Sequence, residues 1–235
     1  MNPRAIPAIT SFIGVNALVF LVMIGQALFH GSGLRSFDKP LIDRRNIGWD
    51  LLLSSGHMSE YGQWWRAVTS SFVHLDASHL IFNLLALLFI GQAVERTLGS
   101  AVTVWVMIGA IGWGSITCLI MQPNAMMGGA STVVYGLMAA LVGIKLAARD
   151  QLVSVAVMVA IYFAWSMFTP GVSLWGHVGG FIGGSVGYLA AGGLRPALGL
   201  RAVLGDHQHT AISPATKAGV AGVLSIIVAA AVGVL

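Results

Sequence analysis

Two long stretches without a charged residue constrain this chain more than any other feature. No Asp, Glu, Lys or Arg occurs from Thr97 to Ile144 or from Gln151 to Leu194, stretches of 48 and 44 residues. The hydrocarbon core of a bilayer is about 30 Å thick, and an apolar helix of roughly 20 residues crosses it. Each stretch is therefore long enough for two membrane-spanning helices. We expect these pairs to turn at Gln122–Asn124 and at Thr169–Gly171.

Three further apolar runs bring the predicted number of spans to seven. They are Ala8–Leu28, Ala77–Val94 and Ala218–Leu235. Charged residues make up 9% of the chain, against about 25% in soluble domains, which excludes an ordinary soluble enzyme. The runs are too continuously apolar for the alternating strands of a membrane barrel. The sequence therefore predicts an all-α membrane protein, a polytopic helical bundle.

The basic residues predict how the chain is divided and oriented. Short loops on the cytoplasmic side are enriched in Lys and Arg, and placing the N-terminus inside leaves seven basic residues inside and five outside. We expect a six-helix core at 1–195 with a long outer loop at 31–66, an inner linker at 196–217 and a seventh helix at 218–235. The predicted location is a bacterial plasma membrane, with the lipid bilayer as the surroundings and the N-terminus in the cytoplasm.

Charge and ligand counts argue against several kinds of partner. The net charge is +4 and the basic residues are scattered, so nucleic acid is not an expected partner. A single cysteine, Cys118, excludes an intramolecular disulfide and a zinc site built on cysteines. His207 and His209 supply only two possible ligands, so no metal is expected.

Three groups of residues lie toward the predicted outer ends of spans two, four and six, with His79, Ser131 and His177 each within about two turns of the outer surface. They are His74, His79 and Asn83; Gly128 and Gly129 with Ser131 and Tyr135; and His177 with Gly180 and Gly184. Polar residues at membrane depth are costly and commonly functional. Their shared depth suggests one site.

The residue types in these groups favour acyl transfer. A serine hydroxyl becomes an effective nucleophile when a base removes its proton, and histidine is the usual base near neutral pH. We expect Ser131 to pair with His177, because Gly180 and Gly184 let the two helices approach closely. The Ser131 N–H, His79 and Asn83 are candidate donors to an oxyanion. No carboxylate is predicted near the pair, which favours a dyad over a triad.

Each of these residues also has a simpler interpretation when taken alone. A serine in a membrane helix usually bonds a carbonyl of its own helix, and an asparagine commonly joins two helices. Tyr135 and the glycines are compatible with packing only. Arg66, and Glu95 and Arg96 at the end of the second span, are interpreted as anchors at the membrane interface.

The sequence resembles the rhomboid intramembrane serine proteases. The resemblance rests on WWRAVTSSFVH, SHLIFNLL, GGASTVVYGL and WGHVGGFIGG, which occur in the family's order across residues 64–187. It implies that Ser131 is the nucleophile and His177 the base, with an oxyanion hole formed by His79, Asn83 and the Ser131 N–H.

The resemblance also implies supporting roles and a substrate class. Tyr135 would pack on the His177 ring, with Gly129 and His74 as further supporting residues. The family cleaves transmembrane helices of other proteins near their outer ends and needs no cofactor. Six core spans with one more at the C-terminus is a known arrangement in this family.

Thr132 departs from the family's Gly-x-Ser-Gly pattern. Its side chain either fills space toward neighbouring helices, which we favour, or narrows the pocket for the substrate side chain. The leading alternative to an active protease is a rhomboid pseudoprotease that binds transmembrane clients. A small transporter is a weaker alternative, because no charged residue lines the spans.

Overall fold

The computed structural model describes residues 5–169, 171–191 and 213–234. Long helices dominate these ranges. They are α1 (Pro7–Phe29), α5 (Ala77–Ala86) continuing through η4 (Leu87–Gly91) into α6 (Gln92–Leu98), α7 (Ser100–Met121), α8 (Ser131–Ala148), α9 (Val153–Phe168), α10 (Leu174–Ala190) and α12 (Pro214–Val234). The all-α, polytopic membrane fold predicted from the sequence is confirmed.

Five of these helices are long and apolar enough to cross a bilayer. They are Pro7–Phe29, Ala77–Leu98, Ser100–Met121, Ser131–Ala148 and Ala215–Gly233. Helices α9 and α10 lie where the fifth and sixth spans were predicted but have only 16 and 17 residues. Most of the predicted inner linker, 196–217, is outside the described residues, and α12 begins at Pro214, before the predicted start at 218. The division into a core, a linker and a seventh helix stays a prediction.

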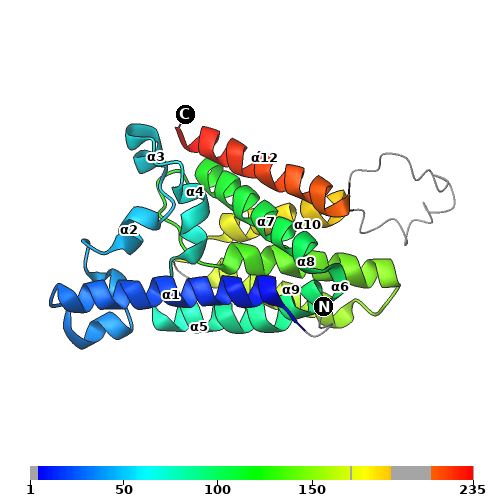
Figure 1. Cartoon of the computed structure of the whole chain (residues 1–235), viewed down its shortest axis with the longest axis horizontal. Helices are drawn as coiled ribbons and strands as arrows, with labels where there is room; N and C mark the ends of the chain where they lie inside the picture. The colour runs from blue at the N-terminus through cyan, green and yellow to red at the C-terminus, as the bar shows by residue number, and fades with distance from the viewer. Residues whose placement is uncertain (1–4, 170, 192–212, 235) are drawn as a thin grey trace.

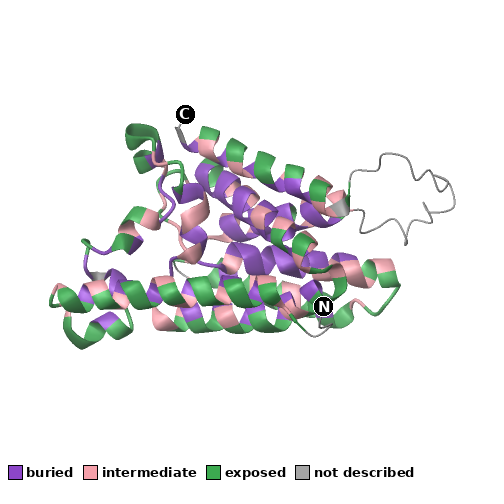
Figure 2. Cartoon of the chain, in the orientation of Figure 1, coloured by how far each residue is buried: buried purple, intermediate pink, exposed green. Residues whose placement is uncertain are grey.

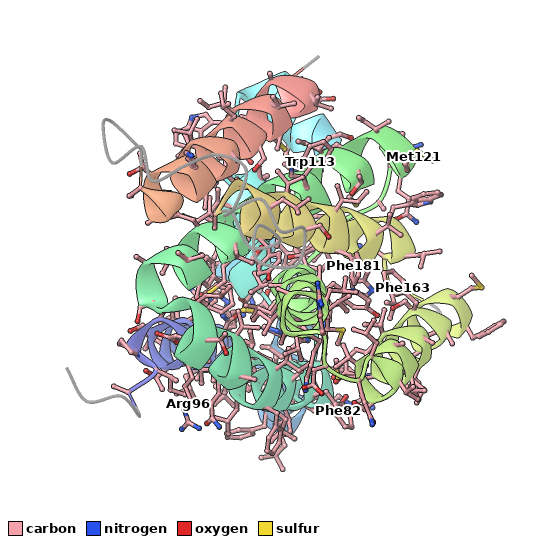
Figure 3. The ribbon with its side chains drawn as sticks, turned by 90° about the vertical axis from the view of Figure 1, so that its right-hand side faces the viewer. Phe82, Arg96, Trp113, Met121, Phe163 and Phe181 are labelled. Atoms are coloured by element: carbon pink, nitrogen blue, oxygen red, sulfur yellow. The ribbon has the colours of Figure 1, made fainter. Side chains whose placement is uncertain are left out.

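Helix α8 is the centre of the bundle. Figure 3 looks nearly along its axis, with the other helices arranged around it. Every residue from Thr132 to Ala140 is buried, and α7 and α10 pack directly against α8. Buried residues gather on these three helices in Figure 2, whereas α1 and α5 carry many exposed residues. Apolar side chains that face outward suit contact with lipid.

Helices α1 and α12 flank the bundle in different ways. Helix α12 lies along α7, where Gly112 approaches the Ser225 backbone and side chain (Figure 1). The first turn of α1 is capped by Glu95, whose carboxylate accepts the N–H groups of Ala8 and Ile9, each over 2.9 Å. Glu95 is buried, so its interpretation as an interface anchor was wrong. A carboxylate from one helix stabilises the N-terminus of another, where helical N–H groups lack partners.

The segment between α1 and α5, most of which was predicted to be the outer loop, contains short helices. These are η1 (Gly33–Phe37), η2 (Pro40–Ile42), α2 (Ile47–Leu51), α3 (Ser55–Tyr61), α4 (Arg66–Thr69) and η3 (Ser70–Phe72). Arg66 is buried and donates to the carbonyls of Trp49 and Leu52 over 2.8 and 2.7 Å. Its guanidinium therefore joins two parts of the loop from within, and the interpretation of Arg66 as an interface anchor was wrong.

Candidate active site

The segment that leads into α8 is held by backbone hydrogen bonds. Leu53 and Met127 exchange N–H to carbonyl bonds of 2.9 and 3.1 Å, which ties this segment to the long loop between α1 and α5. The Gly129 N–H donates to the Ser70 carbonyl over 2.9 Å. Gly129 has a φ of +135°, a conformation that favours glycine. Ser131 follows as the first residue of α8, where the backbone N–H has no partner within the helix.

The structure brings the hydroxyl of Ser131 and the ring of His177 together. The distance from Ser131 Oγ to His177 Nε2 is 2.7 Å. His177 lies in the first turn of α10, which begins where the Ser173 side chain accepts the Gly176 N–H over 3.1 Å. The His177 side chain is buried in the bundle. A hydrogen bond of this length allows a proton to pass from the hydroxyl to the imidazole.

Close packing of α8 and α10 sets this distance. A Cβ on Gly180 would collide with the backbone of Thr132, and a Cβ on Gly184 would collide with the backbone of Gly136. The two helices therefore meet backbone to backbone along one face. The predicted role of these glycines in a close approach agrees with this geometry.

Two further side chains contact the His177 ring, one at its face and one at Nδ1. Tyr135 stacks on it with ring centroids 4.2 Å apart and planes 10° from parallel. Ser166, on α9, places its Oγ 2.7 Å from His177 Nδ1. The sequence predicted the Tyr135 contact through the family resemblance, whereas the Ser166 contact was missed.

His79 and Ser131 approach each other around Gly129. A Cβ on Gly129 would lie 2.7 and 2.8 Å from His79 Cε1 and Nε2, and 3.6 Å from Ser131 Oγ. The absence of a side chain on Gly129 thus lets the His79 ring lie against the backbone just before the serine. His79, Gly129 and Ser131, all predicted from the sequence, therefore lie together in the structure.

Asn83 and His74 make different contacts. The Asn83 side-chain nitrogen donates to the His79 carbonyl over 2.8 Å, a bond within its own helix. His74 Nε2 accepts the Ala130 N–H over 3.3 Å, and its ring meets that of His79 edge-on at 4.9 Å. Burial, and then the neighbouring His79, lower the pKa of His74 to about 3. His74 is therefore neutral at ordinary pH, as an acceptor of the Ala130 N–H must be.

Among the described residues, no carboxylate hydrogen-bonds the His177 ring. Asp76, the nearest in register, instead caps α5 and accepts the His79 N–H over 2.8 Å. A hydroxyl on a neighbouring helix occupies the position that a carboxylate has in a triad.

Comparison with known proteins relates this arrangement to a family. The sequence model of the Rhomboid domain matches residues 61–193, more than half of the chain. The chain belongs to the rhomboid family. This rhomboid is 32% identical over 136 residues to rhomboid protease GluP of Bacillus subtilis (strain 168), a match covering 56% of this chain and 27% of that protein.

Two other relatives give similar matches. Rhomboid-like protease 3 of Toxoplasma gondii is 35% identical over 133 residues, covering 52% of this chain and 49% of that protein. Rhomboid protease GlpG of Yersinia pestis (strain Pestoides F) is 37% identical over 83 residues, covering 34% of this chain and 28% of that protein. This rhomboid thus spans less than two thirds of the length of each of these relatives. The relatives are named as proteases, which supports intramembrane proteolysis as the general function of the family.

The Thr132 side chain of this rhomboid lies against α7. Its side chain is buried, and its Cγ2 lies 2.7 Å from where a Cβ on Gly114 of α7 would be. Its backbone meets Gly180 of α10. Thr132 therefore lies between α7 and α10, an arrangement that favours the space-filling interpretation.

The described part of this rhomboid contains no group of three His, Cys, Asp or Glu side chains placed to hold a metal ion. His207 and His209 lie outside the described residues.

The sequence signal for Ser166 was weak, because serines in apolar helices usually bond a carbonyl of their own helix.

Proposed function

We propose that this rhomboid is a serine endopeptidase that hydrolyses peptide bonds in or near transmembrane helices of other membrane proteins. The observation that carries the proposal is the 2.7 Å contact between Ser131 Oγ and His177 Nε2. Because both side chains lie on closely packed helices, the nucleophile and the base are held together before a substrate arrives.

In this reaction, His177 takes the proton of Ser131 while Oγ bonds to the substrate carbonyl carbon. The carbonyl oxygen becomes an oxyanion in a tetrahedral intermediate. His177 then gives the proton to the leaving amine, the peptide C–N bond breaks, and an ester to Ser131 remains. Water, deprotonated by the same histidine, hydrolyses the ester and releases the new carboxyl end. No cofactor enters this sequence.

The oxyanion is proposed to bind the N–H of Ser131, with His79 and Asn83 as further donors. The position of Ser131 at the start of α8 supports this, since helical N-termini attract negative charge. Asn83 has a second side-chain N–H besides the one given to the His79 carbonyl. In this proposal Gly129 makes room for His79, and His74 holds the Ala130 N–H in place.

Transmembrane segments are the proposed substrates because the site lies among apolar helices. The outward faces of α5 and α9 carry large exposed apolar side chains, which suit lipid or another apolar helix. They are Ile81, Phe82, Leu85, Val157, Ile161 and Trp165. A bacterial plasma membrane, with a cytoplasmic N-terminus and a site open to the outside, is the proposed location.

Cleavage of a transmembrane substrate by purified variants tests the reaction. Ser131→Ala and His177→Ala should each lower the rate by up to about 10⁶-fold, and the double variant should be no worse, because the two residues act as a unit. Thermal unfolding verifies that the variants fold. Folded Ser131→Ala protein that retains substantial cleavage would overturn the proposal. Binding of transmembrane clients without any cleavage by the wild type would favour the pseudoprotease.

The orientation has a separate test in intact cells. Ser59, in the outer loop, and Ala148, at the end of α8, are both exposed. A cysteine at Ser59 should react with an impermeant thiol reagent, whereas one at Ala148 should not. Native Cys118 is buried, so it gives little background. Labelling at Ala148 alone would reverse the proposed orientation.

A further inference from the structure

We propose that Ser166 is the residue that positions the base: its hydroxyl accepts the Nδ1–H of His177, so that Nε2 is left free to take the proton of Ser131. This inference rests on the proposed function. It assigns to α9 a part in the reaction that neither the sequence motifs nor the relatives' names indicate.

The geometry places Ser166 at the junction of a buried network. Its Oγ lies 2.7 Å from His177 Nδ1, 2.9 Å from the Tyr162 carbonyl oxygen and 2.5 Å from the Tyr135 hydroxyl. The Tyr135 hydroxyl in turn lies 2.6 Å from the same Tyr162 carbonyl. Ser166 is 3% exposed, so bulk water is not a ready substitute for these partners.

Counting protons shows how the network supports a base. A neutral imidazole has one N–H, and if Nε2 is to accept from Ser131, the hydrogen must be on Nδ1. The Ser166 oxygen can accept that hydrogen because its own proton can go to the Tyr162 carbonyl, which only accepts. The Tyr135 hydroxyl shares its proton between that carbonyl and the second lone pair of the Ser166 oxygen, which lies 2.5 Å away.

The same arrangement suits the charged form of the base. When the Ser131 O–H bond breaks and the Nε2–H bond forms, His177 carries two N–H groups and a positive charge. The Nδ1–H bond to Ser166 remains, and hydrogen bonds to charged groups are stronger than neutral ones. No proton has to leave the Ser166 hydroxyl, which stays neutral throughout.

A hydroxyl has an advantage over a carboxylate at this depth. An ionised carboxylate at membrane depth carries a large desolvation cost, whereas a neutral hydroxyl avoids it. The simpler role for Ser166 is the usual bond to the carbonyl four residues earlier. That bond is present, and it does not compete with the proposed role, because it orients the serine proton away from His177 and leaves a lone pair for Nδ1–H.

Turnover of Ser166 variants with a transmembrane substrate tests this role. Ser166→Ala should lower kcat by about 10- to 100-fold with little change in KM, the range expected for losing one hydrogen bond to a charged group. Ser166→Thr, which restores a hydroxyl, should recover most of the rate. Ser166→Cys fills the same space with a weak acceptor, so it should be slow like the alanine variant even if Ser166→Ala folds poorly.

Ser185→Ala is the matched control. Ser185 lies on α10, and its hydroxyl bonds the Phe181 carbonyl over 2.9 Å within its own helix. This variant should keep the wild-type kcat. Wild-type kcat in folded Ser166→Ala or Ser166→Cys would overturn the positioning role, as would failure of Ser166→Thr to exceed the alanine variant. These results would not contradict the proposed pairing of Ser131 with His177, whereas activity of Ser131→Ala would contradict that pairing itself.

Discussion

Helix α8 packs against α10 and against α9 in two different ways. His177, on α10, contacts residues of both α8 and α9. Against α10, α8 packs backbone to backbone at Gly180 and Gly184. Against α9, it packs through side chains, with the Tyr135 and Phe163 rings 4.8 Å apart. Phe163 continues the contact to Phe181 of α10, toward which it points in Figure 3.

This difference separates two requirements of the base that we propose His177 to be. The backbone contact with α10 sets how far His177 lies from Ser131, and it depends on the absence of side-chain volume. The contact with α9 sets how the imidazole is oriented, and it depends on one polar atom of Ser166. Added bulk should therefore damage the first interface, whereas removal of a polar atom should damage the second.

Added bulk at Gly184 should have the largest effect. A valine there would place side-chain atoms on the backbone of Gly136. Overpacking of this kind typically costs about 1–3 kcal/mol and forces the backbone to shift. Gly184→Val should lower both the unfolding temperature and the cleavage rate, the rate by roughly 100-fold or more because a shift of about 1 Å misplaces the dyad.

Gly14→Val on α1 is the control for the Gly184 variant, because no atom lies within 4 Å of a Cβ at that position. It should leave both the unfolding temperature and the cleavage rate near wild type. Normal cleavage by Gly184→Val would show that the distance between the dyad residues does not depend on this contact.

Removal of the Tyr135 hydroxyl should have a smaller effect. Tyr135→Phe keeps the ring stacked on His177 but removes the group that contacts Ser166 and the Tyr162 carbonyl. We expect kcat to fall by about 3- to 10-fold, since a neutral hydrogen bond contributes roughly 1 kcal/mol. Tyr162→Phe should have little effect on the rate, because Tyr162 contributes a carbonyl that any residue supplies. An equal loss in both variants would contradict the proposed network.

Thr132→Gly should have the smallest effect on catalysis. Loss of the packed side chain and the lower helix propensity of glycine should reduce the free energy of unfolding by about 1–2 kcal/mol. Preference among substrates with Ala, Ser, Leu or Phe before the cut should not change, because Thr132 points toward α7. A marked gain for Leu and Phe would mean that Thr132 lines the substrate pocket instead.

The fold was largely predictable because charge marks the ends of membrane spans. Helices α7 and α8 fill the charge-free stretch from Thr97 to Ile144, with a turn where Gln122–Asn124 interrupts the apolar run. The capping of α1 by Glu95 was not predictable, since a charged residue at the end of a span usually lies at the interface. The sequence does not show which helix terminus lies next to the Glu95 side chain.

The pairing of Ser131 with His177 followed from their predicted depth and the glycines between them. Ser166 lacked such a signal. Helix α9 is apolar around its circumference, so its pattern does not show which face meets α8. Its serine has a partner in its own helix by default, and only the packing of Tyr135 against α9 brings its oxygen to His177.

Chemical labelling of the serine is the most direct test of the central claim, that Ser131 is a nucleophile activated by His177. The purified protein would be treated with a fluorophosphonate, digested and mapped by mass spectrometry. The expected result is one phosphonylated residue, Ser131, in the wild type, and no adduct in Ser131→Ala or His177→Ala. An adduct on another residue, or strong labelling of Ser131 in the His177→Ala variant, would contradict the claim.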